Sequence, residues 1–211
     1  MASTMIHMAV ANEVNKKIHR NLDKLLLGSI APDISKQIGE TKKKSHFLEE
    51  DHSNIPQIDK FLDKYKDNLN DDFVMGYFIH LYTDYLWYKY FMTEIYDHKD
   101  HIIKKMDGTY VKCSGRMLSL YIYNDYTDMN IKLLKEYDLD LHIFYNDIPK
   151  MENIIKEIPM KKLNIIVDNA SIIIEKSKEH KTLIFNIDQI KKFIDTSTEL
   201  TISKLNEILS R

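Results

Sequence analysis

Cysteine is almost absent from this chain of 211 residues, in which Cys113 is the only one. A single thiol excludes a disulfide framework and a zinc site built from cysteines. Glycine occurs five times and proline four times, so residues that break helices are scarce. No apolar run approaches the roughly 18 residues of a membrane-spanning helix, and the first residues lack the pattern of a secretion signal. We therefore expect a cytoplasmic protein without a transmembrane segment.

An excess of one charge is also lacking, because 30 basic residues are balanced by 32 acidic ones and the net charge is -2. This balance gives no overall field that would attract nucleic acid or an anionic membrane. Hydrophobic residues make up 44% of the chain and charged residues 29%, which argues against disorder. The length suits one domain and no linker divides the chain, so we expect residues 1–211 to form a single domain.

The long periodic stretches with few breakers predict an all-α fold, a bundle of many helices. Asp71 and Asp72 stand at the start of one such stretch, where acidic side chains cap a helix and interact favourably with its dipole. We expect residues 28–54 to be irregular and residues 98–114 to form a loop or a short hairpin. The predicted helices cover residues 5–27, 55–69, 72–97, 115–137, 148–157, 161–177 and 187–210.

Two segments allow a different secondary structure. LNIIVDNASIII (residues 163–174) and TLIFNID (residues 182–188) are rich in β-branched side chains. Such residues favour strands by propensity alone, so both segments could be strands, the first in place of the helix predicted over residues 161–177.

Two polar residues stand out in the segment GYFIHLYTDYLW, which is otherwise apolar and aromatic. His80 and Asp84 lie four positions apart, and residues at this spacing share one face of a helix. An imidazole and a carboxylate one turn apart can bind the same cation. An ionisable pair is costly to bury unless it is paired or bound to a metal. Core packing with a hydrogen bond is the alternative interpretation.

Three further residues complete a candidate set of metal ligands, and each also has a plainer interpretation. His7 could be a partly buried histidine near the terminus, and His46 an ordinary loop histidine. Asp33 follows Pro32 and could be a turn or cap residue. Together with the helical pair, they supply the nitrogen and oxygen ligands that zinc accepts. The sequence therefore indicates one metal site between helices.

The order and surroundings of these residues resemble the zinc-dependent phospholipase C family, whose all-α fold is shared by the fungal single-strand nucleases. Four elements carry the resemblance: TxxHxxxAxxV around His7, then LLLGSIAPD, then KSHF, then GYFIHLYTDYLW. By motif it covers roughly residues 1–95, and beyond them only the helical layout is similar. The ordered set is specific, whereas no single element is.

The resemblance implies a role for each residue of the set. Asp33, His46, His80 and Asp84 match the four ligands of the family's principal zinc ion. His7 matches the histidine that binds a second zinc ion together with the bridging aspartate, which corresponds to Asp84. One or two zinc ions are therefore expected, with Mn or Fe as alternatives.

The rest of the family's metal site matches this chain less well. Secreted members use an N-terminal tryptophan at the second ion, where the amine of Ala2, exposed by removal of the first methionine, would be within reach here. The third ion needs a histidine near position 90, which is Tyr90, and His98 and His101 are in a different register. Asp125 is the preferred extra ligand, and a polar side chain that faces solvent is the alternative.

We therefore expect a hydrolase that cleaves a phosphoric ester, of a small molecule or a lipid, with a metal-activated water. The family's aspartate that matches Asp33 lies near the attacking water, so the resemblance implies that Asp33 is also the general base. Lys36 and the run of residues 42–44 either attract a phosphate or form a solvated loop.

Other functions stay open. A nuclease-type phosphodiesterase is disfavoured because the sequence has no basic stripe. A non-catalytic metal-binding or interaction protein is favoured by the missing downstream histidines. A third class, phosphohydrolases with an adjacent His-Asp dyad, is only weakly indicated, because Asp51 and His52 occur in the reverse order.

Overall fold

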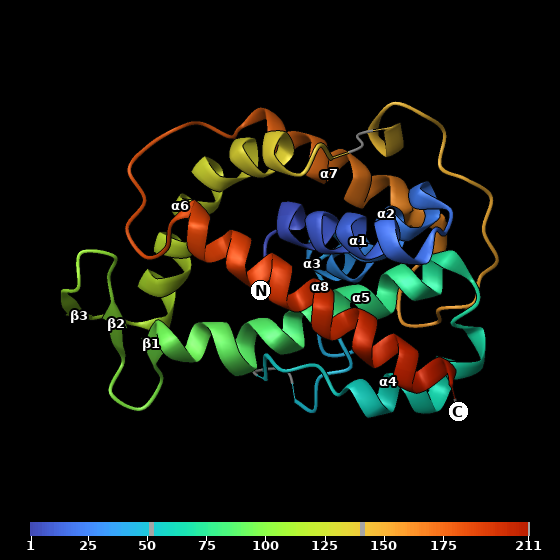
Figure 1. The fold of residues 1–211 in the computed structure, drawn as a ribbon, viewed down its shortest axis with the longest axis horizontal. Coiled ribbons are helices and arrows are strands. Elements are labelled where there is room, and N and C mark those ends of the chain that lie inside the picture. Colours follow the sequence, from blue (N-terminus) through green and yellow to red (C-terminus); the bar gives the residue numbers. More distant parts are fainter. Residues whose placement is uncertain (51–52, 140–141, 211) are drawn as a thin grey trace.

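The computed structural model describes residues 1–50, 53–139 and 142–210. The chain is mostly helical, as the sequence predicts, and a small antiparallel sheet lies at one end of the bundle (Figure 1). Within these residues no helix is both long and apolar enough to cross a membrane. The α-helices of the described part are α1 (Thr4–Ile18), α2 (Leu22–Ile30), α3 (Ile34–Gln37), α4 (Ile58–Tyr65), α5 (Asp72–Leu86), α6 (Gly115–Glu136), α7 (Leu163–Glu175) and α8 (Ile187–Leu209).

The first predicted helix is divided into two. Ser3 caps α1 by accepting a hydrogen bond from the backbone amide three residues later. His19 ends α1 in the left-handed conformation, with a φ of 53°, and Asn21 caps the start of α2 in the same way as Ser3 caps α1. The single helix predicted over residues 5–27 is therefore wrong, because a left-handed residue followed by a new cap interrupts it.

Two glycines bring α2 and α5 into direct backbone contact. A Cβ atom on Gly28 would lie 2.2 Å from the carbonyl oxygen of Phe73, and one on Gly76 would lie 2.1 Å from that of Leu25. Only hydrogen fits at either position. This contact fixes the position of α5 along α2. It therefore also positions His80, which lies one turn beyond Gly76.

Residues 28–54 contain more regular structure than the sequence predicts. Helix α2 continues to Ile30, and the 3-10 turn η1 (Ala31–Asp33) follows it without a break. Pro32 fits in the first turn of η1, where its missing amide is not needed. The short α3 then ends, and turns and bends follow over residues 38–50.

Helix α5 begins where the sequence predicts, because Asp71 accepts hydrogen bonds of 3.0 Å from the backbone amides at positions 73 and 74. It ends before the predicted residue 97. A π-helical turn, η3 (Trp87–Phe91), and a 3-10 turn, η4 (Met92–Glu94), lead from it into the sheet. Helix α4, which packs against α5, likewise continues as a 3-10 turn, η2 (Lys66–Asn68).

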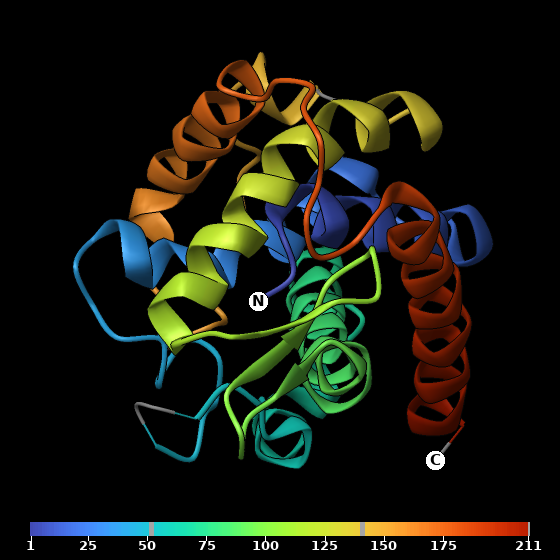
Figure 2. The same cartoon turned by 90° about the vertical axis from the view of Figure 1, so that its left-hand side faces the viewer.

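The sheet contains the strands β1 (Tyr96–Asp97), β2 (Ile102–Lys104) and β3 (Tyr110–Lys112) in sequence order. Both pairings are antiparallel, and Ile103 lies opposite Tyr96 on one side and Val111 on the other. The loop or short hairpin predicted for residues 98–114 is therefore confirmed. Figure 2 shows the turn between β2 and β3 next to the segment that precedes α8, where Met106 N donates to the Leu183 carbonyl.

The last third of the chain settles the two ambiguous segments. LNIIVDNASIII is helical, as α7, whereas TLIFNID is a loop that leads into α8. The helix predicted over residues 148–157 is absent. Its end is instead held by α4, because Tyr65 accepts a hydrogen bond from Lys156 N and donates one to Glu157. Two 3-10 turns complete the region, η5 (His142–Phe144) and η6 (Met160–Lys162).

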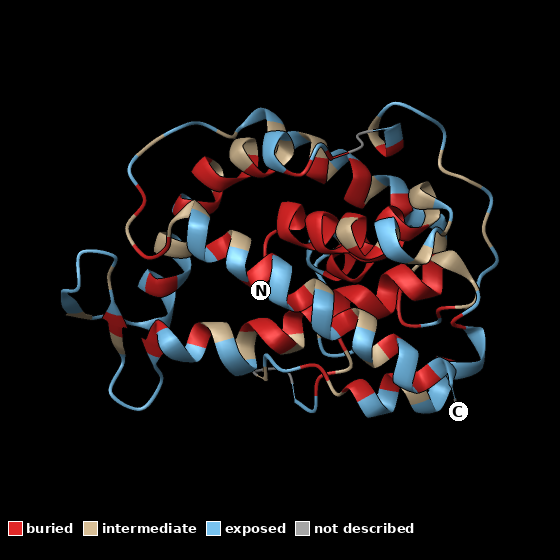
Figure 3. Ribbon diagram, in the orientation of Figure 1, coloured by how far each residue is buried: buried red, intermediate tan, exposed pale blue. Residues whose placement is uncertain are grey.

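The core lies around α1 and α5. Figure 3 shows both helices buried along most of their length, and α1 is buried on nearly all sides from Thr4 to Asn12. A helix surrounded in this way is normally apolar. Polar side chains on α1 and α5 therefore lie inside the bundle, and His7 and His80 are fully buried.

Candidate metal centre

Five polar side chains from four parts of the chain meet inside the bundle. His7 comes from α1, His80 and Asp84 from successive turns of α5, Asp33 from η1, and His46 from the loop after α3. None of the five residues is more than 8% exposed. The structure thus brings together all five residues of the set that the sequence indicates, while their role as metal ligands stays a prediction.

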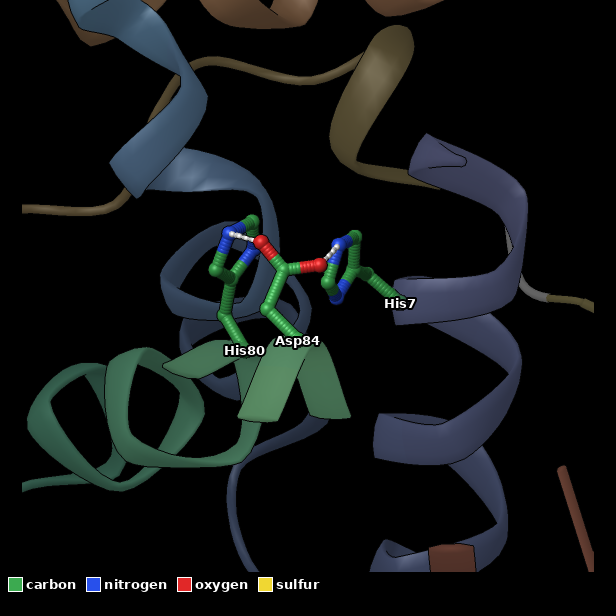
Figure 4. Close-up of side chains that lie close together, drawn as sticks. All are labelled: His7, His80 and Asp84. Carbon is green, nitrogen blue, oxygen red and sulfur yellow. Dashed lines mark ion pairs between the residues drawn. The ribbon is translucent and has the colours of Figure 1, made fainter. Parts of the chain in front are cut away.

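Asp84 lies between three imidazoles. Its Oδ1 is 3.4 Å from His7 Nε2, and its Oδ2 is 3.8 Å from Nε2 of both His46 and His80. Figure 4 shows the carboxylate between His7 of α1 and His80 of α5. The backbone amide of Ala2 also donates to Oδ1, at 3.0 Å. The two oxygens of Asp84 therefore face different histidines, as in a carboxylate that bridges two ions.

His46 connects Asp33 to His80. Its Nε2 lies 3.5 Å from Asp33 Oδ1 and 3.2 Å from His80 Nε2. Two nitrogens bound to one tetrahedral zinc ion at about 2.0–2.1 Å are separated by about 3.3–3.4 Å. The distance between the two imidazole nitrogens therefore matches that of two ligands on one ion.

The second ring nitrogen of His80 determines which tautomer is present. His80 Nδ1 lies 2.7 Å from the backbone carbonyl oxygen of Ser29. A carbonyl oxygen can only accept, so Nδ1 carries the proton and Nε2 of the neutral ring has a free lone pair. A hydrogen bond of this kind is the usual support of a metal-binding histidine. Sequence reasoning missed Ser29, because its contribution is a backbone atom.

Several polar atoms of the cluster lack hydrogen-bond partners. Among the described residues, neither ring nitrogen of His7 nor Oδ2 of Asp84 has one. The His7 ring instead stacks on that of His80, with centroids 3.8 Å apart and planes 12° from parallel. A buried polar atom without a partner costs about 1–3 kcal/mol. One cation could supply a partner for one ring nitrogen of His7 and for Asp84 Oδ2, since the two nitrogens of an imidazole point in different directions.

The ligand atoms form two overlapping groups, each close enough to hold one ion. One group is His7, His80 and Asp84, and the other is Asp33, His46 and His80. His80 belongs to both groups, and Asp84 Oδ2 faces the imidazoles of His46 and His80. The sequence predicts one or two ions, and the geometry supplies candidate ligands for either number.

The protonation states suit metal binding. Burial lowers the pKa of both His46 and His80, and the neighbouring His7 adds to the effect on His80. Burial alone would raise the pKa of Asp84, but the adjacent His7 holds it below its usual value. The neutral imidazoles of His46 and His80 beside the ionised Asp84 are the forms that bind a metal.

Lys42 is paired within the site. Its Nζ donates to Asp33 Oδ1 at 2.9 Å, so Lys42 is not part of a solvated loop. Burial alone would raise the pKa of Asp33, but the Lys42 ammonium and the His46 imidazole hold it well below its usual value. Lys36, by contrast, donates to Tyr123 Oη at 2.8 Å. Residues 43 and 44 are exposed.

A cavity of about 360 Å³ lies beside the cluster, with Asp33 in its wall. The N-terminal residues, α3, α6 and α7 surround it. Its lining combines the ammonium groups of Lys36 and Lys176 with apolar side chains such as Ile166 and Ile173. A molecule in this cavity would be in reach of the cluster through Asp33.

Asp125, the preferred extra ligand, has different partners from those expected. It is fully buried on α6 and lies outside both ligand groups. Its carboxylate accepts hydrogen bonds from the backbone amides of Leu183, Ile184 and Phe185, at 2.7–3.2 Å. The prediction of Asp125 as a ligand is not supported, since its oxygens hold the segment before α8.

The other downstream candidates also lie elsewhere. His101 Nδ1 is 2.8 Å from Tyr96 Oη in the sheet, and the His98 ring packs edge-on against Tyr96. Tyr90, at the position of the family's third-ion histidine, is half exposed. The dyad Asp51–His52 lies outside the described residues.

Comparison with known proteins adds no relative: no family model, no curated protein and no solved structure matches the chain. The similarity to the zinc-dependent phospholipase C family therefore stays an expectation from its motifs. Any function proposed for the chain depends on the geometry of the cluster itself.

Proposed function

We propose that the chain is a zinc-dependent phosphoric ester hydrolase of phospholipase C type. The observation that carries the proposal is that ring nitrogens of His7 and Oδ2 of Asp84 lack hydrogen-bond partners inside an otherwise packed core. A purely structural polar cluster would satisfy its own hydrogen bonds. A cluster built to bind a cation leaves lone pairs free until the cation binds.

The donor set favours zinc. Three imidazoles and two carboxylates combine nitrogen and oxygen ligands, which suit Zn, whereas Mg and Ca prefer oxygen alone. Mn and Fe tolerate the same ligands and are the alternatives. Asp33, His46 and His80 would hold the first ion, His7 the second, and Asp84 would contact both.

In the proposed hydrolysis, different residues of the chain have different roles. When bound, the metal lowers the pKa of a water molecule and neutralises charge on the phosphoryl group. Asp33, in the wall of the cavity, would take the proton of the attacking water as general base, with a proton affinity that the neighbouring Lys42 and His46 reduce. Lys42, which already pairs with Asp33, would keep a positive charge beside that carboxylate.

The cavity beside the cluster supports a phosphoric ester as substrate. Lys36 and Lys176 offer positive charge, and the isoleucines of α7 offer an apolar wall. Its volume of about 360 Å³ is within the usual range of small-molecule pockets. It suits a phosphoester of a small molecule, or the headgroup region of a lipid.

Metal content and turnover test the proposal together. The purified protein is loaded with Zn, Mn or Fe, its bound metal is measured, and a phosphodiester and a phosphomonoester of p-nitrophenol are offered. We expect stoichiometric zinc and hydrolysis of one ester, and the loss of both in Asp84→Asn. Asp128→Asn is the matched control, because Asp128 is equally buried but pairs with Lys132 and the His180 amide.

One observation favours a second candidate, a metal-binding protein without catalysis. The proposed general base Asp33 is already paired with Lys42, and His98 and His101 do not join the cluster. Stoichiometric zinc without hydrolysis of either ester would favour this candidate. Protein without bound transition metal, unchanged by His80→Ala, would contradict both.

A further inference from the structure

A second, larger cleft of about 620 Å³ lies beyond the C-terminal end of α5. Its walls come from the turns η3 and η4, from the connection between β2 and β3, and from the first half of α8. It shares no lining residue with the cavity beside the metal centre. The wall at α8 is distant in sequence from the other two, so the cleft, called the hairpin cleft below, exists only in the folded chain.

Positive charge predominates in the hairpin cleft. Lys104, Lys105 and Lys192 line it, against the carboxylate of Glu94, and Asp107 lies in the adjacent turn, where the charge of Lys105 acts on it. In the part of the chain that the structure describes, none of these lysines has a carboxylate within 4.0 Å of its Nζ. Lys191, the residue before Lys192, has a carboxylate partner, because it pairs with Glu136. The ammonium groups of Lys104, Lys105 and Lys192 are therefore not fixed in ion pairs, and that of Lys105 interacts with Asp107 only at longer range.

The rest of the lining is largely apolar and aromatic. Phe91 and Phe193 pack together at its base, with ring centroids 5.2 Å apart. Tyr90 and Met106 are 52% and 40% exposed at the cleft. Tyr90 and Phe91 belong to the π-helical turn η3, and such turns occur frequently at functional sites. An apolar base below a few charged groups is the usual make-up of a small-molecule site.

We propose that the hairpin cleft binds a small organic phosphate with an apolar or aromatic body. Three lysines against the carboxylates of Glu94 and the adjacent Asp107 leave an excess of one positive charge, which favours an anionic group such as a phosphate. Lysine is a regular ligand of phosphate, and its charged hydrogen bonds are strong. The body of the ligand lies over Phe91 and Phe193, and Tyr90 covers it at the rim.

The only tryptophan of the chain reports on the cleft. Trp87 is fully buried, and its ring lies 4.4 Å from that of Phe91 and 5.0 Å from that of Phe193, between centroids. Both phenylalanines line the cleft. A ligand that rests on them changes the surroundings of Trp87, so its fluorescence is a direct signal of binding.

Phenylphosphonate is the probe, because its carbon–phosphorus bond resists hydrolysis at the metal centre. The full-length protein is titrated with it while Trp87 fluorescence is followed, and calorimetry checks the affinity. We expect saturable binding that Lys192→Gln and Lys105→Gln each weaken about tenfold, the effect of losing one charged hydrogen bond. Inorganic phosphate and benzyl alcohol, which each supply half of the chemistry, should bind at least tenfold more weakly.

Two control variants distinguish binding in the hairpin cleft from general surface charge and from binding at the metal centre. Lys191→Gln removes the neighbouring charge outside the cleft and should leave the affinity unchanged. His80→Ala disrupts the metal centre and should also leave it unchanged. If Lys191→Gln and Lys192→Gln weakened the affinity for the probe equally, binding would depend on general surface charge and not on the hairpin cleft. Loss of binding in His80→Ala would assign the probe to the metal centre, and absence of saturable binding would overturn the proposal outright.

Discussion

The Nδ1 atom of His80 lies 2.7 Å from the carbonyl oxygen of Ser29, and this contact joins the metal centre to the packing of α2 against α5. The carbonyl fixes the proton on Nδ1 and leaves Nε2 free for a ligand role. Ser29 is held opposite His80 because Gly28 and Gly76 let the backbones of α2 and α5 touch. The scaffold and the candidate site are therefore built by the same helix contact.

Substitution of Gly76 by alanine should separate the two helices. The new Cβ would lie 2.1 Å from the carbonyl oxygen of Leu25, and backbone cannot move aside cheaply. We expect a loss of about 2–3 kcal/mol in the free energy of unfolding, measured with urea, and weaker zinc binding because His80 moves from Ser29. Gly115→Ala is the control, since nothing lies within 4 Å of a Cβ there. Equal stability of both variants would show that the contact is looser than described.

The parts of the site that the sequence predicts are those determined by helical spacing and helix capping. His80 and Asp84 share a face of α5 because four residues make about one turn, and Asp71 marks the start of that helix. His7 is found instead through the motif TxxHxxxAxxV, and in the structure it lies on α1, which Ser3 caps. Local spacing and capping thus predict individual elements well.

Local spacing and capping do not predict features that depend on residues distant in sequence. The pairing of Lys42 with Asp33 depends on the path of the loop after α3. Asp125 looks like a ligand until Leu183 and its neighbours, 58–60 residues later, occupy its oxygens. The helix predicted over residues 148–157 is lost to hydrogen bonds with Tyr65. Each of these outcomes is decided by tertiary contacts that no local pattern encodes.

Removal of the Lys42 ammonium should strengthen metal binding. In the described structure the ammonium neutralises Asp33, so a bound cation has to compete with it for the carboxylate. We expect Lys42→Met to bind zinc roughly fivefold more tightly, in competition with a chelator, because about 1 kcal/mol of competing attraction is lost. Lys36→Met should have no effect, since Lys36 pairs with Tyr123. Weaker zinc binding in Lys42→Met would mean that the ammonium supports the metal site.

Acid should destabilise the metal-free protein at a pH where carboxylates are still ionised. Burial lowers the pKa of His46 and His80 below the usual 6.5, so the unfolded chain takes up protons before the folded one does. The free energy of unfolding is therefore at its full value above about pH 6.5 and falls as the pH drops below it. Zinc should be released over the same range, because its ligands must be deprotonated.

Urea unfolding at a series of pH values, with and without zinc, measures both effects. His80→Gln carries a side chain that does not titrate, so its stability should depend less steeply on pH between about pH 7 and pH 5. His98→Gln removes an exposed histidine and should keep the slope of the original chain. An identical slope in all three proteins would show that the buried histidines titrate as they do in the unfolded chain.

Substitutions of Asp125 test whether its carboxylate is structural or a metal ligand. Asp125→Ala leaves the buried amides of Ile184 and Phe185 without acceptors, and we expect a loss of about 2–4 kcal/mol in the free energy of unfolding with zinc content unchanged. Asp125→Asn keeps one acceptor oxygen and should lose less. Hydrogen exchange should speed up in residues 183–185, because their amides lose the carboxylate. A drop in bound zinc at unchanged stability would instead restore Asp125 to the ligand set.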